Sequence, residues 1–275
     1  MFQFKRLTVI AGPCSLENQE MCMEVARFAV KATSELGLDF IFKGSFDKAN
    51  RTSYDSFRGH GMEEGLSILD SIRNELKIAV LTDVHESYQV KSVAQVVDVI
   101  QIPAYLCRQT SLIEAAAKAV GKKNNIASAI NIKKGQFLAP WDVKMIVKKA
   151  KSFNPSLTRN NLWLTERGTS FGYNNLVVDM KGIHYLRETG CPIIMDATHA
   201  VQEPGANGSS SGGKRFLVPL LARAAVAAGV DGVFMEIHPD PDNALSDGPN
   251  MLNLQQFKSL ISDLSKIHDL VTTFV

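Results

Sequence analysis

The sequence has little of what marks secreted, membrane-bound or nucleic-acid-binding chains. It has only four cysteines in 275 residues, widely spaced and without a Cys-x-x-Cys pair, so we expect reduced thiols rather than a disulfide framework. No apolar run approaches the roughly 20 residues that a membrane-spanning helix requires. Neither charge sign dominates, with 30 basic and 28 acidic side chains, so the net electrostatic field is too weak to attract nucleic acid or anionic lipid non-specifically. We therefore expect a soluble, cytoplasmic protein that binds neither nucleic acid nor membrane.

The chain is instead rich in short apolar runs that alternate with longer segments of helical spacing. The runs, rich in Val and Ile and apolar on both faces as in covered parallel strands, are 7–14, 39–45, 77–84, 99–104, 126–133, 162–168, 192–199 and 232–238. The clearest helical segments are 20–36, 63–76, 112–120, 141–152, 214–228 and 254–271.

This alternation predicts the fold class. Eight strands and about eight helices fit an α/β protein of the (β/α)8 TIM-barrel type better than a doubly wound open sheet. The first strand runs into AGPCSLEN, which lacks the GxGxxG that a dinucleotide-binding sheet carries. No linker or repeat divides the chain, so we expect one domain over residues 1–275. We expect the tryptophans, Trp141 and Trp163, to pack between helices and strands.

Polar side chains stand at the ends of all eight predicted strands. In a barrel these ends meet on one rim, where catalytic groups collect. At a single strand end, a charged residue can mean only that the strand ends at the protein surface, and this reading is as good as a functional one. Polar residues at all eight strand ends are harder to explain by surface exposure, and they indicate a functional rim.

Cations form the first cluster expected on this rim. They are Lys43, Lys48, Arg51, Arg108, Lys133 and Arg167. Packed together they would repel one another unless something anionic lay among them. Phosphate and carboxylate are the natural ligands of such a set, and six cations suggest two phosphorylated substrates.

A second cluster combines a thiol, an imidazole and two carboxylates: Cys14, His199, Glu236 and Asp247. Each taken alone has a structural reading, since a lone cysteine is usually a small buried side chain and a histidine often bonds a backbone carbonyl. The first, seventh and eighth strands are neighbours in a closed barrel, however, and there these four residues would meet. That meeting predicts a site for a divalent transition metal.

Six segments carry a resemblance that spans the chain in order from the first strand to the eighth. They are AGPCSLEN, FKGSFDKANRTS, INIKKGQFLAPWD, TERGTSFGYNNLVVDM, DATHAVQEPG and FMEIHPDPDNALSDGPN. They closely resemble the 3-deoxy-D-manno-octulosonate 8-phosphate synthase family. The most specific is KANRTS, where the related heptulosonate synthases carry KPRT-type variants. The resemblance implies a TIM barrel that condenses phosphoenolpyruvate with D-arabinose 5-phosphate and water, a step toward the lipopolysaccharide core.

The resemblance also implies roles for individual residues. Phosphoenolpyruvate would be held by Lys43, Ser45, Lys48, Lys133, Gln136 and Arg167. Arabinose 5-phosphate would contact Asn50, Arg51 and Thr52. Arg108 would reach the sugar phosphate in a neighbouring subunit, which fits the homotetramer common in this family. The residues expected to act in catalysis are Lys48, Asn50, His199 and Asp247.

The family divides at the position of Cys14, where a metal-dependent class has cysteine and a metal-independent class has asparagine. Cys14, His199, Glu236 and Asp247 are all present, so the chain resembles the metal-dependent class, with Mn²⁺, Zn²⁺ or Fe²⁺ as the expected ion. Three alternatives stay open: a heptulosonate synthase using erythrose 4-phosphate, a metal-dependent phosphosugar aldolase, and a non-catalytic phosphosugar-binding protein.

Overall fold

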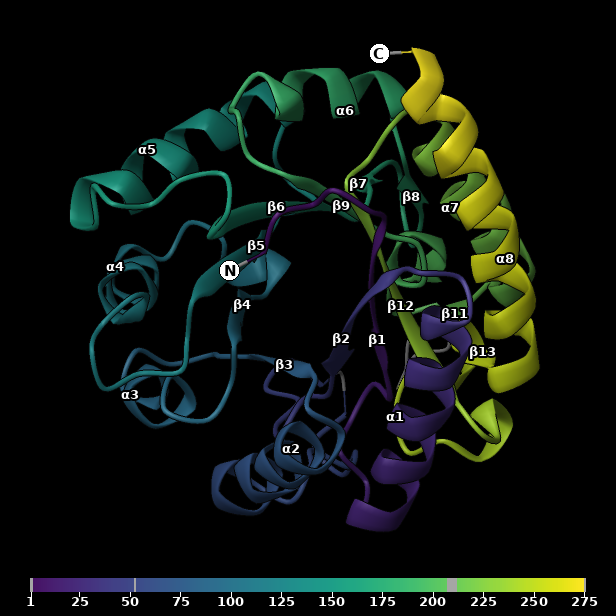
Figure 1. The fold of residues 1–275 in the computed structure, drawn as a ribbon, viewed down its shortest axis with the longest axis horizontal. Coiled ribbons are helices and arrows are strands. Elements are labelled where there is room, and N and C mark those ends of the chain that lie inside the picture. Colours follow the sequence, from purple (N-terminus) through teal and green to yellow (C-terminus); the bar gives the residue numbers. More distant parts are fainter. Residues whose placement is uncertain (1, 52, 207–211, 275) are drawn as a thin grey trace.

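A closed barrel of eight parallel strands lies inside a ring of helices (Figure 1). The computed structural model describes residues 2–51, 53–206 and 212–274. The barrel strands are β1 (Thr8–Gly12), β2 (Asp39–Lys43), β3 (Ala79–Asp83), β4 (Val99–Ile102), β5 (Ala129–Lys133), β6 (Leu162–Glu166), β9 (Ile193–Asp196) and β12 (Gly232–His238). They pair in this order, and β12 pairs with β1 to close the ring. The predicted (β/α)8 fold is confirmed, and each of the eight predicted strands is present.

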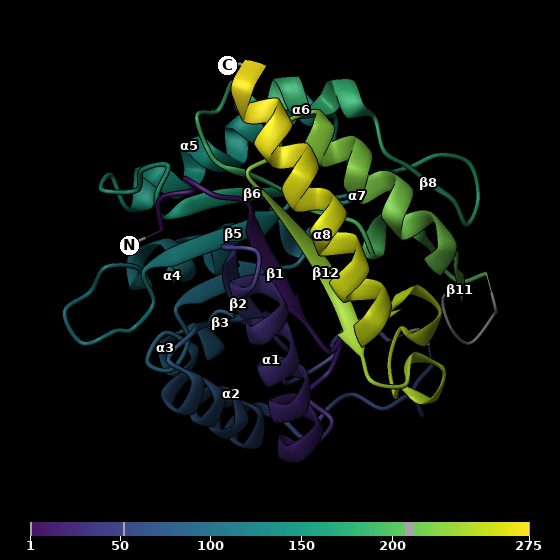
Figure 2. The same ribbon diagram turned by 45° about the vertical axis from the view of Figure 1, so that its right-hand side comes forward.

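Helices cover the outer face of the barrel. They are α1 (Gln19–Ser34), α2 (Met62–Leu76), α3 (Gln89–Val93), α4 (Thr110–Ala119), α5 (Val143–Phe153), α6 (Met180–Arg187), α7 (Val218–Ala227) and α8 (Leu254–Val271). Figure 2 shows α7 and α8 lying side by side along the barrel wall. None of the helices in the described ranges is both long and apolar enough to cross a membrane.

The longest helix shows why these segments are helical. Asn253 and Gln256 form a capping box at the start of α8, in which each side chain bonds the backbone N–H of the other. Phe257, Leu260 and Leu264 follow at helical spacing and are buried. The helix therefore turns one apolar stripe onto the barrel and leaves its other side to solvent.

Short elements join the barrel to its rim. They are the hairpin β7 (Thr169–Ser170) with β8 (Leu176–Val177), the hairpin β10 (Gln202–Glu203) with β11 (Gly212–Gly213), and β13 (Leu252–Asn253), which pairs in parallel with the end of β12. The short 3-10 helices η3 (His199–Val201) and η6 (Gly248–Asn250) begin at or just after two predicted site residues. These elements stand at the carboxyl ends of the strands, where the site was expected.

An apolar layer fills the barrel interior, with one side chain from every strand. Its members are Ile10, Ile41, Leu81, Val99, Ala129, Trp163, Ile194 and Phe234. Trp163 is thus inside the barrel, and the expectation that it packs between helices and strands is wrong. Phe2 and Phe4 contact its indole edge-to-face, with ring centroids 4.7 and 4.9 Å away. The N-terminal segment therefore closes the floor of the barrel.

Trp163→Ala is expected to lower the free energy of unfolding by about 3–5 kcal/mol, because it empties the largest side chain of this layer. Trp141→Ala is the control: Trp141 is 51% exposed and Trp163 is fully buried. Urea unfolding of both variants measures the difference. Equal losses would contradict the interior placement of Trp163.

Candidate active site

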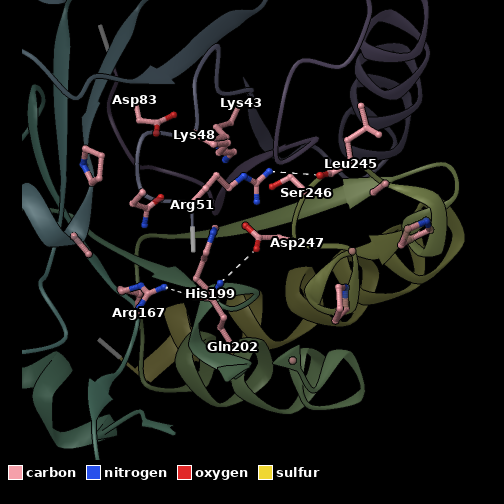
Figure 3. A pocket seen from close by; sticks show the side chains of 18 of the residues that line it. Lys43, Lys48, Arg51, Asp83, Arg167, His199, Gln202, Leu245, Ser246 and Asp247 are labelled. Carbon is pink, nitrogen blue, oxygen red and sulfur yellow. Dashed lines mark hydrogen bonds between the residues drawn. The ribbon is translucent and has the colours of Figure 1, made fainter. Parts of the chain in front are cut away.

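A cavity of about 900 Å³ opens at the carboxyl ends of the barrel strands. Figure 3 shows side chains from several of its walls converging on it. Nine residues predicted from the sequence line it: Lys43, Lys48, Asn50, Arg51, Lys133, Gln136, Arg167, His199 and Asp247. Of the other five, Cys14, Ser45 and Glu236 are buried and contact residues that line the cavity. Arg108 is exposed and is not among the described residues that line it, and Thr52 falls outside the described residues.

The two barrel lysines on the cavity floor are paired with carboxylates. Lys133 Nζ lies 2.6 Å from Asp196 Oδ2, and Lys43 Nζ lies 3.3 Å from Glu236 Oε1. Both ammonium groups also stand over the Phe234 ring, 3.8 Å away for Lys133 and 5.6 Å for Lys43. The mutual repulsion expected of the cations is therefore relieved partly by the protein itself, and not only by a ligand.

Arg167 keeps an open donor for an anion. Its Nη2 donates to Gln202 Oε1 over 3.2 Å, while its buried Nη1 has no hydrogen-bond partner among the described residues. Burial lowers the pKa of Arg167, with Asp196 and Asp247 opposing the shift, but a guanidinium remains charged in any case. A buried charged donor without a partner is costly, and a phosphate or carboxylate oxygen would satisfy it.

A buried ion pair holds the Arg167 backbone in place. Glu166 Oε1 accepts hydrogen bonds from the N–H groups of Arg167 and Gly168, at 3.0 and 2.6 Å. Lys134 Nζ lies 3.5 Å from the same oxygen and donates to Thr169 Oγ1 over 3.0 Å. The ends of β5 and β6, which carry Lys133 and Arg167, are thereby fixed to each other.

Ser45 lies at the centre of a second network. Its Oγ accepts from Lys43 Nζ at 2.9 Å and from Lys48 Nζ at 3.0 Å, and its proton goes to Asp83 Oδ1. His85 Nε2 lies 3.1 Å from Asp83 Oδ2. Although burial opposes the charge on Asp83, the hydrogen bond from His85 and the charge of Lys43 hold its pKa well below the usual value. One serine thus sets the positions of both lysines.

The thiol and two carboxylates of the predicted metal cluster come together beside Lys43. One ligand atom from each of Cys14, Glu236 and Asp247 lies within 4.8 Å of the others. Pairing of Gly12 with Glu236 between β1 and β12 produces this meeting. His199 lies just outside the group, with Nε2 3.6 Å from Glu236 Oε1.

The same cluster has the donor chemistry that a divalent transition metal needs. Glu236 Oε2 is buried and has no hydrogen-bond partner among the described residues, so one carboxylate oxygen is open to a ligand. His199 Nδ1 lies 2.8 Å from Asp196 Oδ2 without hydrogen-bond geometry, and the His199 backbone N–H donates to Asp196 Oδ1 over 2.9 Å. Asp196 thereby holds the histidine beside Glu236, as carboxylates commonly do for ligating histidines. Thiol, imidazole and carboxylate together suit Zn²⁺, Fe²⁺ or Mn²⁺.

Electrostatics prepare this cluster for a cation. Burial raises the pKa of the Cys14 thiol, and the charges of Asp247 and Glu236 raise it further. Although burial opposes the charge on Glu236, His199 and Lys43 lower its pKa to about 2. Asp247 has a left-handed backbone with φ of 51°, a conformation sparsely populated outside glycine that often marks a functional residue.

Four polar residues that no sequence pattern marked with a role take part in the site: Asp83, His85, Asp196 and Gln202. Asp83, His85 and Asp196 stand at predicted strand ends, so the sequence indicated that they reach the rim. It did not indicate which residues they contact there. Gln202 lies three residues after His199 in the segment DATHAVQEPG, and nothing in its residue type or spacing marked it.

The chain is similar to known proteins over almost its whole length. The model of the DAHP synthetase I family matches residues 3–273. The 2-dehydro-3-deoxyphosphooctonate aldolase of Methylobacillus flagellatus is 55% identical, covering 94% of this chain and 89% of that protein. Proteins with the same name from Xylella fastidiosa and a Synechococcus species are 54% and 51% identical. The matches cover 97% and 96% of this chain, and 92% and 89% of those proteins.

Proposed function

The chain belongs to the DAHP synthetase I family, and from this premise we propose the reaction that the rim cavity carries out. The enzyme condenses phosphoenolpyruvate with D-arabinose 5-phosphate and water, and releases 3-deoxy-D-manno-octulosonate 8-phosphate and inorganic phosphate. The observation that carries this proposal is the cavity itself, which is lined by Lys43, Lys48, Arg51, Lys133 and Arg167. Two anionic substrates fit such a lining better than one.

Phosphoenolpyruvate occupies the deeper part of the cavity in this proposal. Lys43, Lys48 and Lys133, which surround Ser45 and Phe234, neutralise its negative charge together with the open donor of Arg167. Although burial opposes the charge on Lys48, nearby Cys14 and Glu236 raise its pKa, so its ammonium group stays charged. Gln136 completes the site as a neutral hydrogen-bonding side chain.

Arabinose 5-phosphate enters above it, beside Asn50 and Arg51. The chain's residues then hold the enol methylene carbon against the sugar aldehyde, which removes much of the entropic cost of a reaction between two molecules. A carbon–carbon bond forms, and water adds to the neighbouring carbon as positive character develops there. The resulting tetrahedral intermediate loses phosphate by cleavage of its carbon–oxygen bond. In this proposal His199 and Asp247, which both line the cavity, exchange protons with that water.

Metal dependence is part of the same proposal. Cys14, His199, Glu236 and Asp247 would hold one divalent ion, with Asp196 orienting the histidine. The chemistry that such an ion supplies is the orientation and deprotonation of a water molecule. Lys43, which donates to the Cys14 carbonyl oxygen over 3.2 Å and pairs with Glu236, ties this cluster to the phosphoenolpyruvate site.

Phosphate release tests the proposed reaction. Purified protein is incubated with arabinose 5-phosphate or erythrose 4-phosphate, each with and without phosphoenolpyruvate and with and without a strong chelator. We expect release with the five-carbon sugar, little with the four-carbon sugar, and none in chelator. Faster release with erythrose 4-phosphate would favour a heptulosonate synthase. Turnover of a phosphosugar without phosphoenolpyruvate would favour an aldolase.

We further propose that Arg108 acts in the site of a neighbouring subunit of a homotetramer. Arg108 is exposed, and its carbonyl oxygen accepts from Lys149 Nζ over 3.1 Å. Among the described residues, its guanidinium neither lines the cavity nor forms an ion pair. Arg51→Ala and Arg108→Ala proteins, each with low activity, are expected to regain activity when mixed and reassembled. Absence of recovery in mixed tetramers confirmed by mass would contradict a role between subunits.

A further inference from the structure

Gln202 lies between the two halves of the proposed site. It belongs to β10 and lines the cavity. Its Oε1 accepts from Arg167 Nη2 over 3.2 Å, and its Nε2 lies 3.5 Å from Asp247 Oδ1 (Figure 3). One amide group therefore joins a guanidinium of the anion site to a carboxylate of the metal cluster.

Only one orientation of this amide satisfies both neighbours. An amide has an accepting oxygen at one end and a donating NH₂ at the other. Turned around, it would place donor against donor at Arg167 and oxygen against oxygen at Asp247. Leucine would bond neither neighbour, and glutamate would bind Arg167 but repel Asp247. Glutamine is therefore the residue type that matches opposite charges on its two sides.

Neither contact occupies the atom that its neighbour needs for a ligand. Arg167 gives Nη2 to Gln202, while its buried Nη1 has no partner among the described residues. Asp247 turns Oδ1 to Gln202, while Oδ2 accepts from the Cys14 thiol over 3.1 Å. An anion on Arg167 and a cation beside Cys14 can therefore bind while both contacts to Gln202 persist.

From this geometry we infer that Gln202 is a positioning residue that couples phosphoenolpyruvate binding to metal binding. The inference rests on the proposed function, since it needs both sites. An anion that orders Arg167 also fixes the Gln202 amide, and the fixed amide holds Asp247 in its metal-binding orientation. The second ligand then meets a lower ordering cost, and this is positive coupling. By reciprocity, the metal raises the affinity for phosphoenolpyruvate by the same factor.

The test measures Mn²⁺ affinity by competition with a chelating indicator, with and without saturating phosphoenolpyruvate. We expect phosphoenolpyruvate to tighten Mn²⁺ binding by about fivefold or more in the unaltered protein, the lower end of ordinary coupling. In Gln202→Leu the ratio of Mn²⁺ affinities with and without phosphoenolpyruvate should be lower than in the unaltered protein by about threefold or more, because the coupling is lost. Gln202→Glu should also lose the coupling and bind phosphoenolpyruvate more weakly, because its carboxylate competes for Arg167.

Glu203→Gln is the matched control. Glu203 is the other residue of β10, and its carboxylate pairs with Lys214 Nζ at 2.7 Å rather than with Arg167 or Asp247. It should keep the full coupling. If Glu203→Gln loses as much coupling as Gln202→Leu, the inference is overturned. The backbone of the β10–β11 hairpin, and not the Gln202 side chain, would then carry the coupling.

The remaining outcomes distinguish a failure of this inference from a failure of the proposed function on which it rests. Unchanged coupling in both folded Gln202 variants, with Mn²⁺ still bound, overturns the role of Gln202 alone. Absence of Mn²⁺ binding in the unaltered protein overturns the metal half of the proposed function, and the coupling with it. If Gln202→Leu fails to fold, Gln202→Glu carries the same test, since it keeps the bond to Arg167.

Discussion

Removing divalent metal from the protein is expected to lower turnover to about one-thousandth or less, and adding back Mn²⁺, Zn²⁺ or Fe²⁺ is expected to restore it. A bound ion typically contributes several kcal/mol to transition-state stabilisation, and about 4 kcal/mol corresponds to a thousandfold in rate. The protein is treated with a strong chelator, freed of it, and assayed after elemental analysis has confirmed the loss of metal. The melting temperature should fall as well, because an ion that binds the native state stabilises it.

A cysteine pair locates the effect at the proposed cluster. Cys14→Ala should lose metal and turnover, since its sulfur lies within 4.8 Å of ligand atoms on Glu236 and Asp247. Cys22→Ala removes an equally buried thiol from α1 that is not a member of the cluster, and should keep both metal and turnover. Full activity in protein verified as metal-free would contradict metal dependence. Metal retained at full affinity by Cys14→Ala would contradict the ligand set.

The architecture was predictable because its signals are local. Apolar runs on both faces, separated by amphipathic segments, recur eight times, and a closed barrel is the arrangement that buries all of them. The same topology makes β1 and β12 neighbours, so the approach of Cys14 and Glu236 follows from strand order, whereas the segment after β12 brings Asp247 to them. What the sequence predicted well is therefore which residues reach the rim.

The pairing of those residues was not predictable from spacing. Lys133 with Asp196, and Lys43 with Glu236, join strands whose facing side chains depend on register and on rotamer. Trp163 shows the same limit in the core. A buried strand is apolar on both faces, so its pattern does not say which face holds the interior of the barrel. Gln202 was missed because its role depends on contacts with Arg167 and Asp247, which are distant from it in the sequence.

Arg51→Ala is the second large effect expected, and it should separate the two substrates. Loss of a hydrogen bond to a charged group costs about 1.5–3 kcal/mol, so KM for arabinose 5-phosphate should rise roughly 10- to 150-fold. KM for phosphoenolpyruvate should change little, because Asn50 is exposed and Arg51 half-buried, whereas groups proposed to hold phosphoenolpyruvate, such as Arg167, are buried. Arg51→Lys should fall between, since lysine keeps the charge but loses the planar fork. Steady-state kinetics with each substrate varied in turn measure both constants.

Arg51 also helps to hold its own loop, and this requires a control. Its Nε donates to the Phe57 carbonyl oxygen over 2.9 Å, so its removal affects the backbone as well as the substrate. Arg58 secures the same loop through a two-bond contact with Asp47, at 3.0 and 2.7 Å, and does not line the cavity in the part of the chain described. Arg58→Ala should therefore loosen the loop without removing a sugar-phosphate contact. An equal loss for both substrates in Arg51→Ala, or an equal sugar-phosphate defect in Arg58→Ala, would contradict direct binding by Arg51. A defect confined to Arg51 and to arabinose 5-phosphate would place the second anion site at the mouth of the cavity.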